Sequence, residues 1–356
     1  MAFDARRSLT GASDPAKIYH RSILRRVALI AGAGGLLLCV MIADILTGPA
    51  LLSVGEVVGA LTGAEEISRT TSAIVNAIRL PQALMAIVVG AALGAAGALM
   101  QTILGNPLAS PYTLGFSAAA GVGAAVAILT GATLPFWPAM TIPVAAFAAS
   151  AFAAALVYGF STIRGMSAEV MVLAGIATLF LFQSLQSMIQ YLAAPEVLQQ
   201  IVFWLFGSMG KANWSNLPIS ASLTAIGLAL AATDFRRLTA LRLGDDRAAA
   251  VGVDVVRLRR KVFAIVALLT AGAVAFVGAI GFVGLVAPHL ARMTVGEDQR
   301  FLIPMSAMLG ALVMSGASIL SKTLSPGGII PVGIVTAVIG VPFLFALILK
   351  GRRRYW

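Results

Sequence analysis

The chain has 356 residues, of which 59% are hydrophobic and 11% carry a charge, and its formal net charge is +11. Soluble domains are usually about 45–50% apolar, so this composition excludes an ordinary soluble domain and indicates an integral membrane protein. Its basic excess then marks the flanks of membrane spans and predicts no binding to nucleic acid. The single cysteine, Cys39, excludes a disulfide framework or a cysteine-based metal site within one chain. We expect no cofactor and no resident metal.

Ten segments are predicted to cross the membrane, because a spanning helix needs about 20 mostly apolar residues. Nine are apolar runs at 27–46, 81–101, 112–131, 138–160, 168–193, 216–233, 262–277, 301–321 and 330–349. The tenth, 278–296, holds four glycines and Pro288. Irregular backbone at membrane depth must be covered by protein. We therefore interpret 278–296 as a short broken span inside the bundle, with a re-entrant segment as the alternative.

Lysine and arginine predict the orientation of these spans. They cluster at 6–26, Arg164, 236–261, Arg292, Arg300 and 350–354, whereas the opposite side has only Arg69, Arg79, Lys211 and Lys322. Ten spans place both termini and the loop 234–261 on the basic side, which the positive-inside rule assigns to the cytoplasm. The predicted domains are a cytoplasmic tail (1–26), a polytopic domain (27–350, with the loop 234–261) and a second cytoplasmic tail (351–356).

Two segments are predicted to lie outside the membrane on the less basic side. The segment 51–80 has apolar residues at 54, 57, 58 and 61, which is helical spacing. The segment 194–214 begins beside a proline, is amphipathic and ends at glycines. Each is expected to contain a short surface helix.

The loop 234–261 contains a short helix-forming stretch, "DDRAAAVG", with acidic residues at its start and glycine at its end. Leu243, Ala248, Ala249 and Val251 could bury against a partner, with charged residues around the contact. The alternative is a solvated loop whose arginines merely flank a span.

Several stretches in order resemble the type II ABC importer permeases of the iron-siderophore, haem and cobalamin family. They are "LGDDRAAAVGVD" (243–254), the segment 79–115, "VFWLFGSMGKANW" (202–214), the segment 278–292 and the segment 330–348. The resemblance implies an all-α integral membrane fold of ten transmembrane helices in two related halves, with a cytoplasmic coupling helix. It implies ATP-driven import of an iron chelate, most often a ferric siderophore, across the bacterial inner membrane by alternating access. Haem or cobalamin is the alternative cargo.

The same resemblance implies the partners and the residues that meet them. The partners are a cytoplasmic ATP-binding subunit, an extracytoplasmic substrate-binding protein, membrane lipid and a second permease copy, in a homodimer or pseudo-dimer. The ATPase would be contacted by Leu243, Gly244, Asp245, Asp246, Arg247, Ala248, Ala249, Val251 and Gly252. Arg79 and Lys322 would dock the binding protein through head groups that reach water; the alternative is that they are basic anchors at span ends.

Three polar residues of the fifth predicted span, Gln183, Ser187 and Gln190, share one helix face by their spacing. Hydrogen bonding between helices would explain them, but the resemblance favours the wall of a translocation path.

Two other classes of protein fit the sequence less well. An integral membrane enzyme would need acids, bases or metal ligands gathered at one depth, and the sequence shows no such cluster. An ion-coupled transporter would need charged residues near the middle of spans. The stretch "GASILSKT" (316–323) has Ser321 in place of the second glycine of a P-loop and follows no strand, so ATP hydrolysis is assigned to a separate subunit.

Overall fold

The computed structural model describes residues 15–324 and 328–350, and every regular element within them is a helix. The first part of the chain forms α1 (Pro15–Leu46), α2 (Val54–Thr62), α3 (Arg69–Ala73), α4 (Leu80–Ile103), α5 (Phe116–Thr130), α6 (Thr141–Ile163) and α7 (Ala168–Leu192). The second part forms α8 (Pro195–Leu205), α9 (Leu217–Ala232), α10 (Phe235–Leu241), α11 (Asp245–Ala250), α12 (Val255–Val277), α13 (Val283–Val295), α14 (Gln299–Thr323) and α15 (Val332–Lys350). A π-helix (Ile74–Arg79) leads into α4, and 3-10 turns lie at Pro111–Leu114, Pro138–Met140 and Met209–Lys211.

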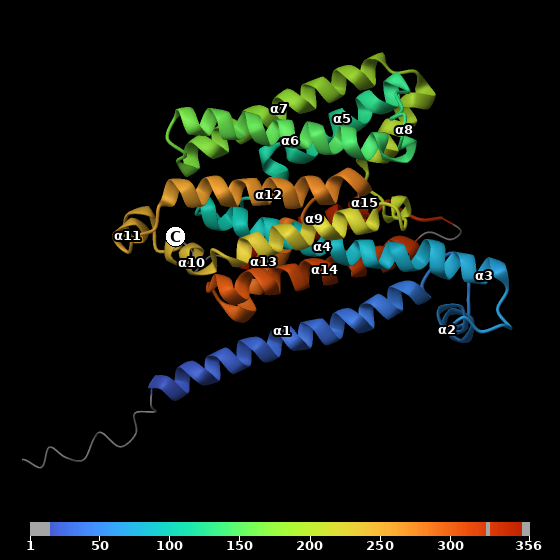
Figure 1. The fold of residues 1–356 in the computed structure, drawn as a ribbon, viewed down its shortest axis with the longest axis horizontal. Helices are drawn as coiled ribbons and strands as arrows, with labels where there is room; N and C mark the ends of the chain where they lie inside the picture. Colours follow the sequence, from blue (N-terminus) through green and yellow to red (C-terminus); the bar gives the residue numbers. More distant parts are fainter. Residues whose placement is uncertain (1–14, 325–327, 351–356) are drawn as a thin grey trace, which may run out of the picture.

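The long helices run side by side around α4 (Figure 1). Every residue of α4 from Ala92 to Ile103 is buried. Its glycines let two neighbours approach closely: a Cβ on Gly97 would lie 1.9 Å from the carbonyl oxygen of Gly284 in α13, and one on Gly90 would lie 2.4 Å from that of Gly310 in α14. Small residues thus replace side-chain packing with backbone contact, the usual means of helix association in a membrane.

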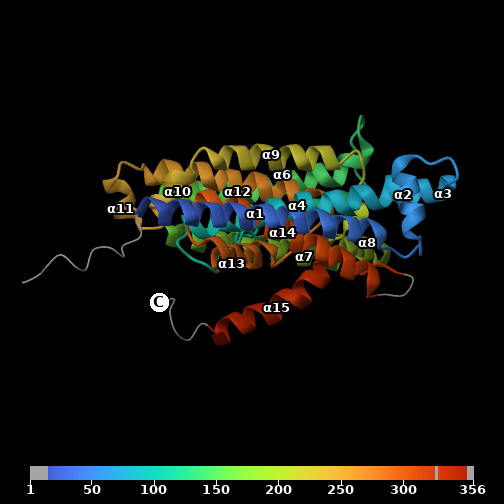
Figure 2. The ribbon, with the colours of Figure 1, turned by 90° about the horizontal axis from the view of Figure 1, so that it is seen from below.

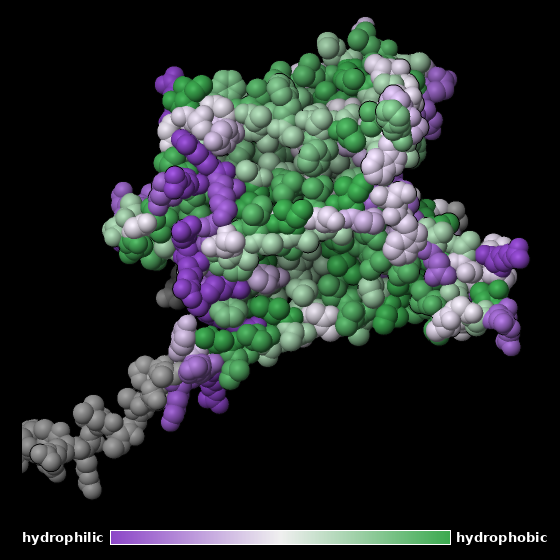
Figure 3. All heavy atoms as spheres, viewed as in Figure 1, coloured by the Kyte–Doolittle hydropathy of each residue, from purple (hydrophilic) through white to green (hydrophobic). Residues whose placement is uncertain are grey.

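The bundle has two distinct ends, here named after the helices that they carry. The α11 end holds α10 and α11, the start of α1 and the end of α15; the α2 end holds α2 and α3 (Figures 1 and 2). Hydrophilic side chains gather at these two ends, with a mainly hydrophobic band between them (Figure 3). Arg26, Arg242 and Arg292 pair with carboxylates at the α11 end. These three arginines, all from the predicted basic side, lie at one end of the fold; the tail segments 1–14 and 351–356 lie outside the described residues.

The expected count of ten spans is not confirmed. Among the described residues, six helices are long and apolar enough to cross a membrane, or seven if the bent pair α9 and α10 forms one span. Each of the ten predicted segments does contain a helix, but α5 and α13 have only 15 and 13 residues. Such short helices lie inside the bundle, so length and hydropathy alone do not identify them as spans.

The two predicted surface helices are both present, as α2 and α8. Ser53 begins α2 with a capping box, because its hydroxyl accepts from the Glu56 backbone while the Glu56 carboxylate accepts from the Ser53 backbone. Gly63 ends the helix in a left-handed conformation. Pro195 occupies the first turn of α8, where no backbone donor is needed.

Candidate functional site

A sharp helical turn projects at the α11 end. Gly244 has φ 102°, which favours glycine, and Gly252 closes the turn with φ 85°. Between them lies the six-residue α11, and on either side of it Leu243 and Val251 are 62% and 70% exposed. Two large apolar side chains thus face outward from one tight turn. Ala249 is also exposed, whereas the side chain of Ala248 is buried within the chain; the partner contact of both stays a prediction.

The turn stands on a fixed base. The guanidinium of Arg259 in α12 donates to both carboxylate oxygens of Asp245, at 2.7 and 2.9 Å, and its Nε donates to the carbonyl of Ile103 at 3.0 Å. All three charged residues of α11 are exposed, but the carboxylate of Asp245 is already bound by Arg259 of its own chain. Arg259 links α11, α12 and the end of α4. A displacement of α11 would therefore also displace the end of α4 at the centre of the bundle.

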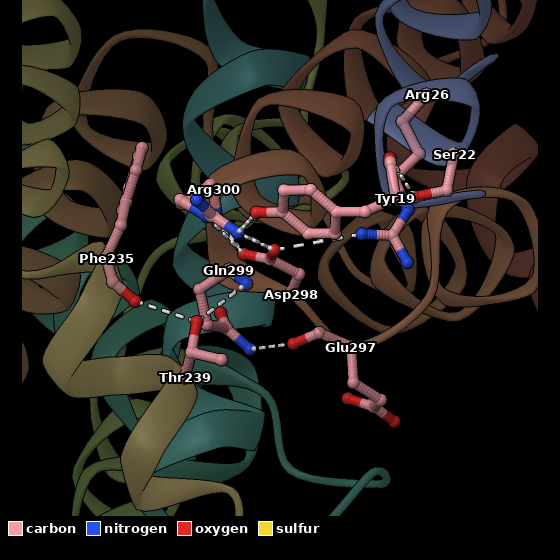
Figure 4. A network of polar contacts seen from close by, with 9 residues as sticks. All are labelled: Tyr19, Ser22, Arg26, Phe235, Thr239, Glu297, Asp298, Gln299 and Arg300. Carbon is pink, nitrogen blue, oxygen red and sulfur yellow. Dashed lines mark hydrogen bonds and ion pairs between the residues drawn. The ribbon is translucent and has the colours of Figure 1, made fainter. Parts of the chain in front are cut away.

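A second polar network at the α11 end was missed by the sequence analysis (Figure 4). Asp298 accepts hydrogen bonds from Arg300 and pairs with Arg26 of α1, 3.7 Å away. The backbone N–H of Gln299 donates to the hydroxyl of Thr239 in α10. The only signal in the sequence was a pair of acidic residues, Glu297 and Asp298, between the basic residues Arg292 and Arg300.

A groove of about 610 Å³ opens beside α15. Its walls come from the turn before α5, the end of α8, the start of α13 and the first half of α15, and they include Tyr112, Phe206, Phe282 and Val338. The polar groups in its lining are hydroxyls and backbone, with no charged side chain. It can accommodate a bulky molecule with a largely apolar surface.

The three predicted path residues do not line this groove. Gln183 and Ser187 lie on the exposed face of α7, and Gln190 is partly exposed. In Figure 1, α7 is on the outer side of the bundle next to α6. Amides on a lipid-facing surface are costly, so the position of Gln183 and Gln190 is consistent with a face that another subunit or water covers.

Arg79 and Lys322 are buried, which corrects the expectation that their head groups reach water. Only 3% of Arg79 and 6% of Lys322 is exposed. Arg79 donates to the carbonyls of Ile45 and Leu46, at 3.1 and 2.9 Å, and to that of Ala50. Lys322 donates to the carboxylate of Asp44 at 2.8 Å. Both cations hold the end of α1 at the α2 end, and a solvent-exposed docking pair is not what the fold presents.

No group of three or more metal-ligating side chains occurs among the described residues. What the fold presents is an apolar turn on a rigid base at one end, a neutral groove, and an uncovered helix face. These are features of a protein that moves a molecule and contacts other chains.

Comparisons with known proteins agree with this geometry. The profile of the FecCD transport family matches residues 36–350. The chain is 36% identical to the hemin transport system permease HmuU of Yersinia pestis, over 78% of this chain and 83% of that protein. It is 35% identical to the Fe(3+)-citrate import system permease YfmD of Bacillus subtilis, over 78% and 82%. It is also 35% identical to the cobalamin import system permease BtuC of Halobacterium salinarum, over 79% and 75%.

A solved structure described as a metal-chelate type ABC transporter in an inward-facing conformation has the same fold. It superposes with a TM-score of 0.81 at 30% identity, over 91% of this chain and 99% of that one. The protein is thus a multi-pass membrane permease of an ABC importer. The chain belongs to the FecCD transport family.

Proposed function

We propose that this chain is the permease of an ATP-driven importer that carries an iron chelate, with a ferric siderophore as the first candidate, across the bacterial inner membrane by alternating access. It would act as a dimer of two permease copies, with ten membrane crossings in two related halves and both termini in the cytoplasm. The names of the relatives support an iron chelate, haem or cobalamin as cargo.

The observation that carries this proposal is the exposed α11 turn on its Arg259 base. An ATP-binding subunit would seat Leu243 and Val251 in an apolar groove, with Asp246 and Arg247 around the contact. Two exposed apolar side chains on one tight turn, with charged residues around them, have the composition of a contact surface with an apolar centre and a polar rim. Movement of the ATPase would then reach α4 through Asp245, Arg259 and the carbonyl of Ile103.

The coupling role is tested by changing Leu243 and Val251 together to aspartate. Co-purification of the ATP-binding subunit and uptake into proteoliposomes should both fall, because a desolvated carboxylate is unfavourable in an apolar contact. The matched control is Phe136→Asp, which places a carboxylate at a fully exposed position in another loop. Normal ATPase binding by the double variant would contradict the role of the turn.

The cargo is tested by uptake in proteoliposomes that contain the permease, its ATP-binding subunit and its binding protein. Labelled ferric siderophore, haem and cobalamin are offered separately, with and without ATP. Uptake of the siderophore alone supports the first candidate, and uptake of haem or cobalamin alone replaces it. Transport driven by an ion gradient without ATP would contradict the importer.

We further propose that Gln183, Ser187 and Gln190 line the path between the two permease copies. Single cysteines at these positions, in a Cys39→Ala background because Cys39 is itself exposed, should react with water-soluble thiol reagents in at least one nucleotide state. A cysteine at Phe180, exposed on the same helix, is the control for lipid-facing positions. Protection of all three positions in every state would place them against another helix.

Docking of the binding protein at the α2 end remains a prediction. The role expected of Arg79 and Lys322 changes from direct contact to support of the docking surface. Their burial means that they would act by holding the backbone at residues 44–50 in place. Arg79→Lys should slow association of the binding protein, while the same change at the exposed Arg69 should have little effect. An unchanged association rate in a folded Arg79→Lys variant would remove the residue from docking.

A further inference from the structure

The helix α13 connects the α11 end of the molecule with the groove. At one end of α13, Arg292 faces the loop that leads into α14, and at the other end Phe282 forms part of the groove wall. Thirteen helical residues span about 20 Å. The helix is continuous through Pro288, so a displacement at Arg292 can reach the groove along one short helix.

The carboxylate of Glu297 links this helix to the α11 turn. Its Oε1 lies 2.9 Å from Nη2 of Arg242, directly before the turn, and 2.9 Å from Nε of Arg292 in α13. Arg292 also donates to the side-chain oxygen of Gln101, which is fully buried in α4. One carboxylate oxygen shared by two guanidinium groups therefore bridges the proposed ATPase contact and α13.

The opposite end of α13 is held in an unusual conformation. Phe282 has φ 67° and ψ −32°, a region that non-glycine residues rarely adopt and that persists only where the surrounding structure imposes it. The surrounding structure is α15: a Cβ on Gly340 would lie 2.4 Å from Cγ of Phe282, so only glycine leaves room for the ring. A second contact, between the rings of His289 and Phe343, has a centroid distance of 5.9 Å.

The helix α15 is otherwise weakly held. It begins against the backbone of Phe206, since a Cβ on Gly333 would lie 2.2 Å from that carbonyl oxygen. Beyond Gly340 large apolar side chains such as Phe345 and Leu349 are exposed, and Figure 2 shows α15 leaning away from the bundle. Phe282 therefore lies between α13 and α15, at the place where the width of the groove is set.

We propose that α13 transmits movement of the α11 turn to the groove. Glu297 is the positioning residue at one end of α13. At the other end, the ring of Phe282 sets the width of the groove between α13 and α15. This inference rests on the proposed function, because the movement comes from an ATP-binding subunit. Glu297 acts through Arg292 and does not touch the cargo.

The test uses the complete transporter in lipid nanodiscs. Spin labels at Tyr112 and Val338, one on each side of the groove, in a Cys39→Ala background report the width of the groove with and without ATP. Glu297→Gln keeps the size of the side chain but removes its charge. It should abolish the ATP-dependent change in distance and lower cargo uptake per ATP hydrolysed by about tenfold, a usual size for coupling between sites, while ATP hydrolysis continues.

Four further variants separate coupling from folding. Glu66→Gln, at an exposed carboxylate near α3 at the other end, should leave the ATP-dependent change in groove distance unaltered. Arg242→Gln should reproduce Glu297→Gln, and the double variant should be no worse than either single variant. Phe282→Gly frees the backbone and removes the ring, so the distance distribution across the groove should broaden in both states.

An unaltered distance change and unaltered uptake per ATP in Glu297→Gln would overturn the inference while leaving the proposed function intact. Absence of any ATP response or ATP-driven uptake in the unmodified transporter would instead remove the proposed function, and this inference with it.

Discussion

The two ends of the bundle use the same kinds of charged residue in opposite ways. At the α2 end, Arg79 and Lys322 are buried, and their donors go to backbone carbonyls and to a single carboxylate, Asp44. At the α11 end, Arg242 and Arg300 are partly exposed, and carboxylates such as Glu297 are shared by more than one cation. A buried charge that loses its partner is very costly, whereas a partly hydrated pair can exchange partners at small cost.

This difference assigns different mechanical properties to the two ends. The α2 end is fixed by contacts that cannot be broken one at a time without exposing a charge to an apolar interior. Apart from the buried Arg259 base, the ion pairs at the α11 end can rearrange, because water and neighbouring arginines can replace a partly exposed pair that breaks. A permease that receives motion at the α11 end benefits from this division. The following predictions, in order of decreasing effect, test it.

The largest loss of stability is expected for Lys322→Met. It leaves the Asp44 carboxylate buried, with a hydrogen bond from the Ser318 hydroxyl but without its ammonium partner. Breaking a buried ion pair costs about 3–5 kcal/mol. Unfolding of the purified protein in detergent should show this loss as a lower midpoint. The double variant Asp44→Asn/Lys322→Met should recover most of it, and a double variant as unstable as the single one would contradict the pairing.

A smaller loss is expected for Arg79→Met. Its guanidinium serves the carbonyls of Ile45, Leu46 and Ala50, which the methionine side chain would leave without a donor. Unsatisfied buried groups cost about 1–3 kcal/mol, so we expect a loss of about 2–3 kcal/mol in the same assay. Arg79→Lys should recover only part of it, because one ammonium lacks the planar reach of the guanidinium. Full recovery by lysine would argue against the three-carbonyl arrangement.

At the α11 end the pH should matter through Asp298. Burial raises the pKa of this carboxyl, but hydrogen bonds from Arg300 and the charge of Arg26 outweigh burial and leave the pKa below its usual value. A carboxyl whose folded pKa is lowered stabilises the fold above its unfolded pKa, and this contribution is lost as the pH falls through the folded pKa. Asp298→Asn should therefore lower the stability at neutral pH, by about 1.5 kcal/mol if it weakens one hydrogen bond to a charged group.

The stability difference between Asp298→Asn and the unmodified protein should shrink as the pH falls below about 4, the usual pKa of an aspartate. Unfolding midpoints at several pH values measure this. A difference that stays constant down to the lowest accessible pH would mean that Asp298 acts through its shape and not through its charge.

The smallest effect is expected for Arg237→Gln. Arg237 pairs with Asp234 at 2.8 Å, but its side chain is 65% exposed, so the pair contributes about 0.5 kcal/mol or less. That small difference should vanish in about 1 M salt, where charges are screened within about 3 Å. A loss above about 1 kcal/mol would show that exposed pairs at this end are less replaceable than the comparison implies.

The local structure of this protein was determined largely by its sequence. Apolar runs form helices because a backbone without water must satisfy its own hydrogen bonds, and each predicted segment from 27–46 to 330–349 contains one. The α11 turn was predictable because Gly244 and Gly252 bracket a helix-forming stretch in a basic loop. The stretches around it also placed the chain in its family before any contact was known.

Only the tertiary structure decided what the charged and strained residues do. Lys322 meets Asp44 across 278 residues of sequence, and Glu297 joins Arg242 to Arg292, so neither partnership is visible in a local pattern. From the sequence alone, Lys322 at the end of a span is predicted to be an exposed anchor, although the packing of α1 buries it. Phe282 gives no signal either, because its positive φ accompanies a contact with Gly340 of α15 that only the fold supplies. Sequence patterns record local hydropathy and helix period, whereas burial and pairing depend on which helices become neighbours.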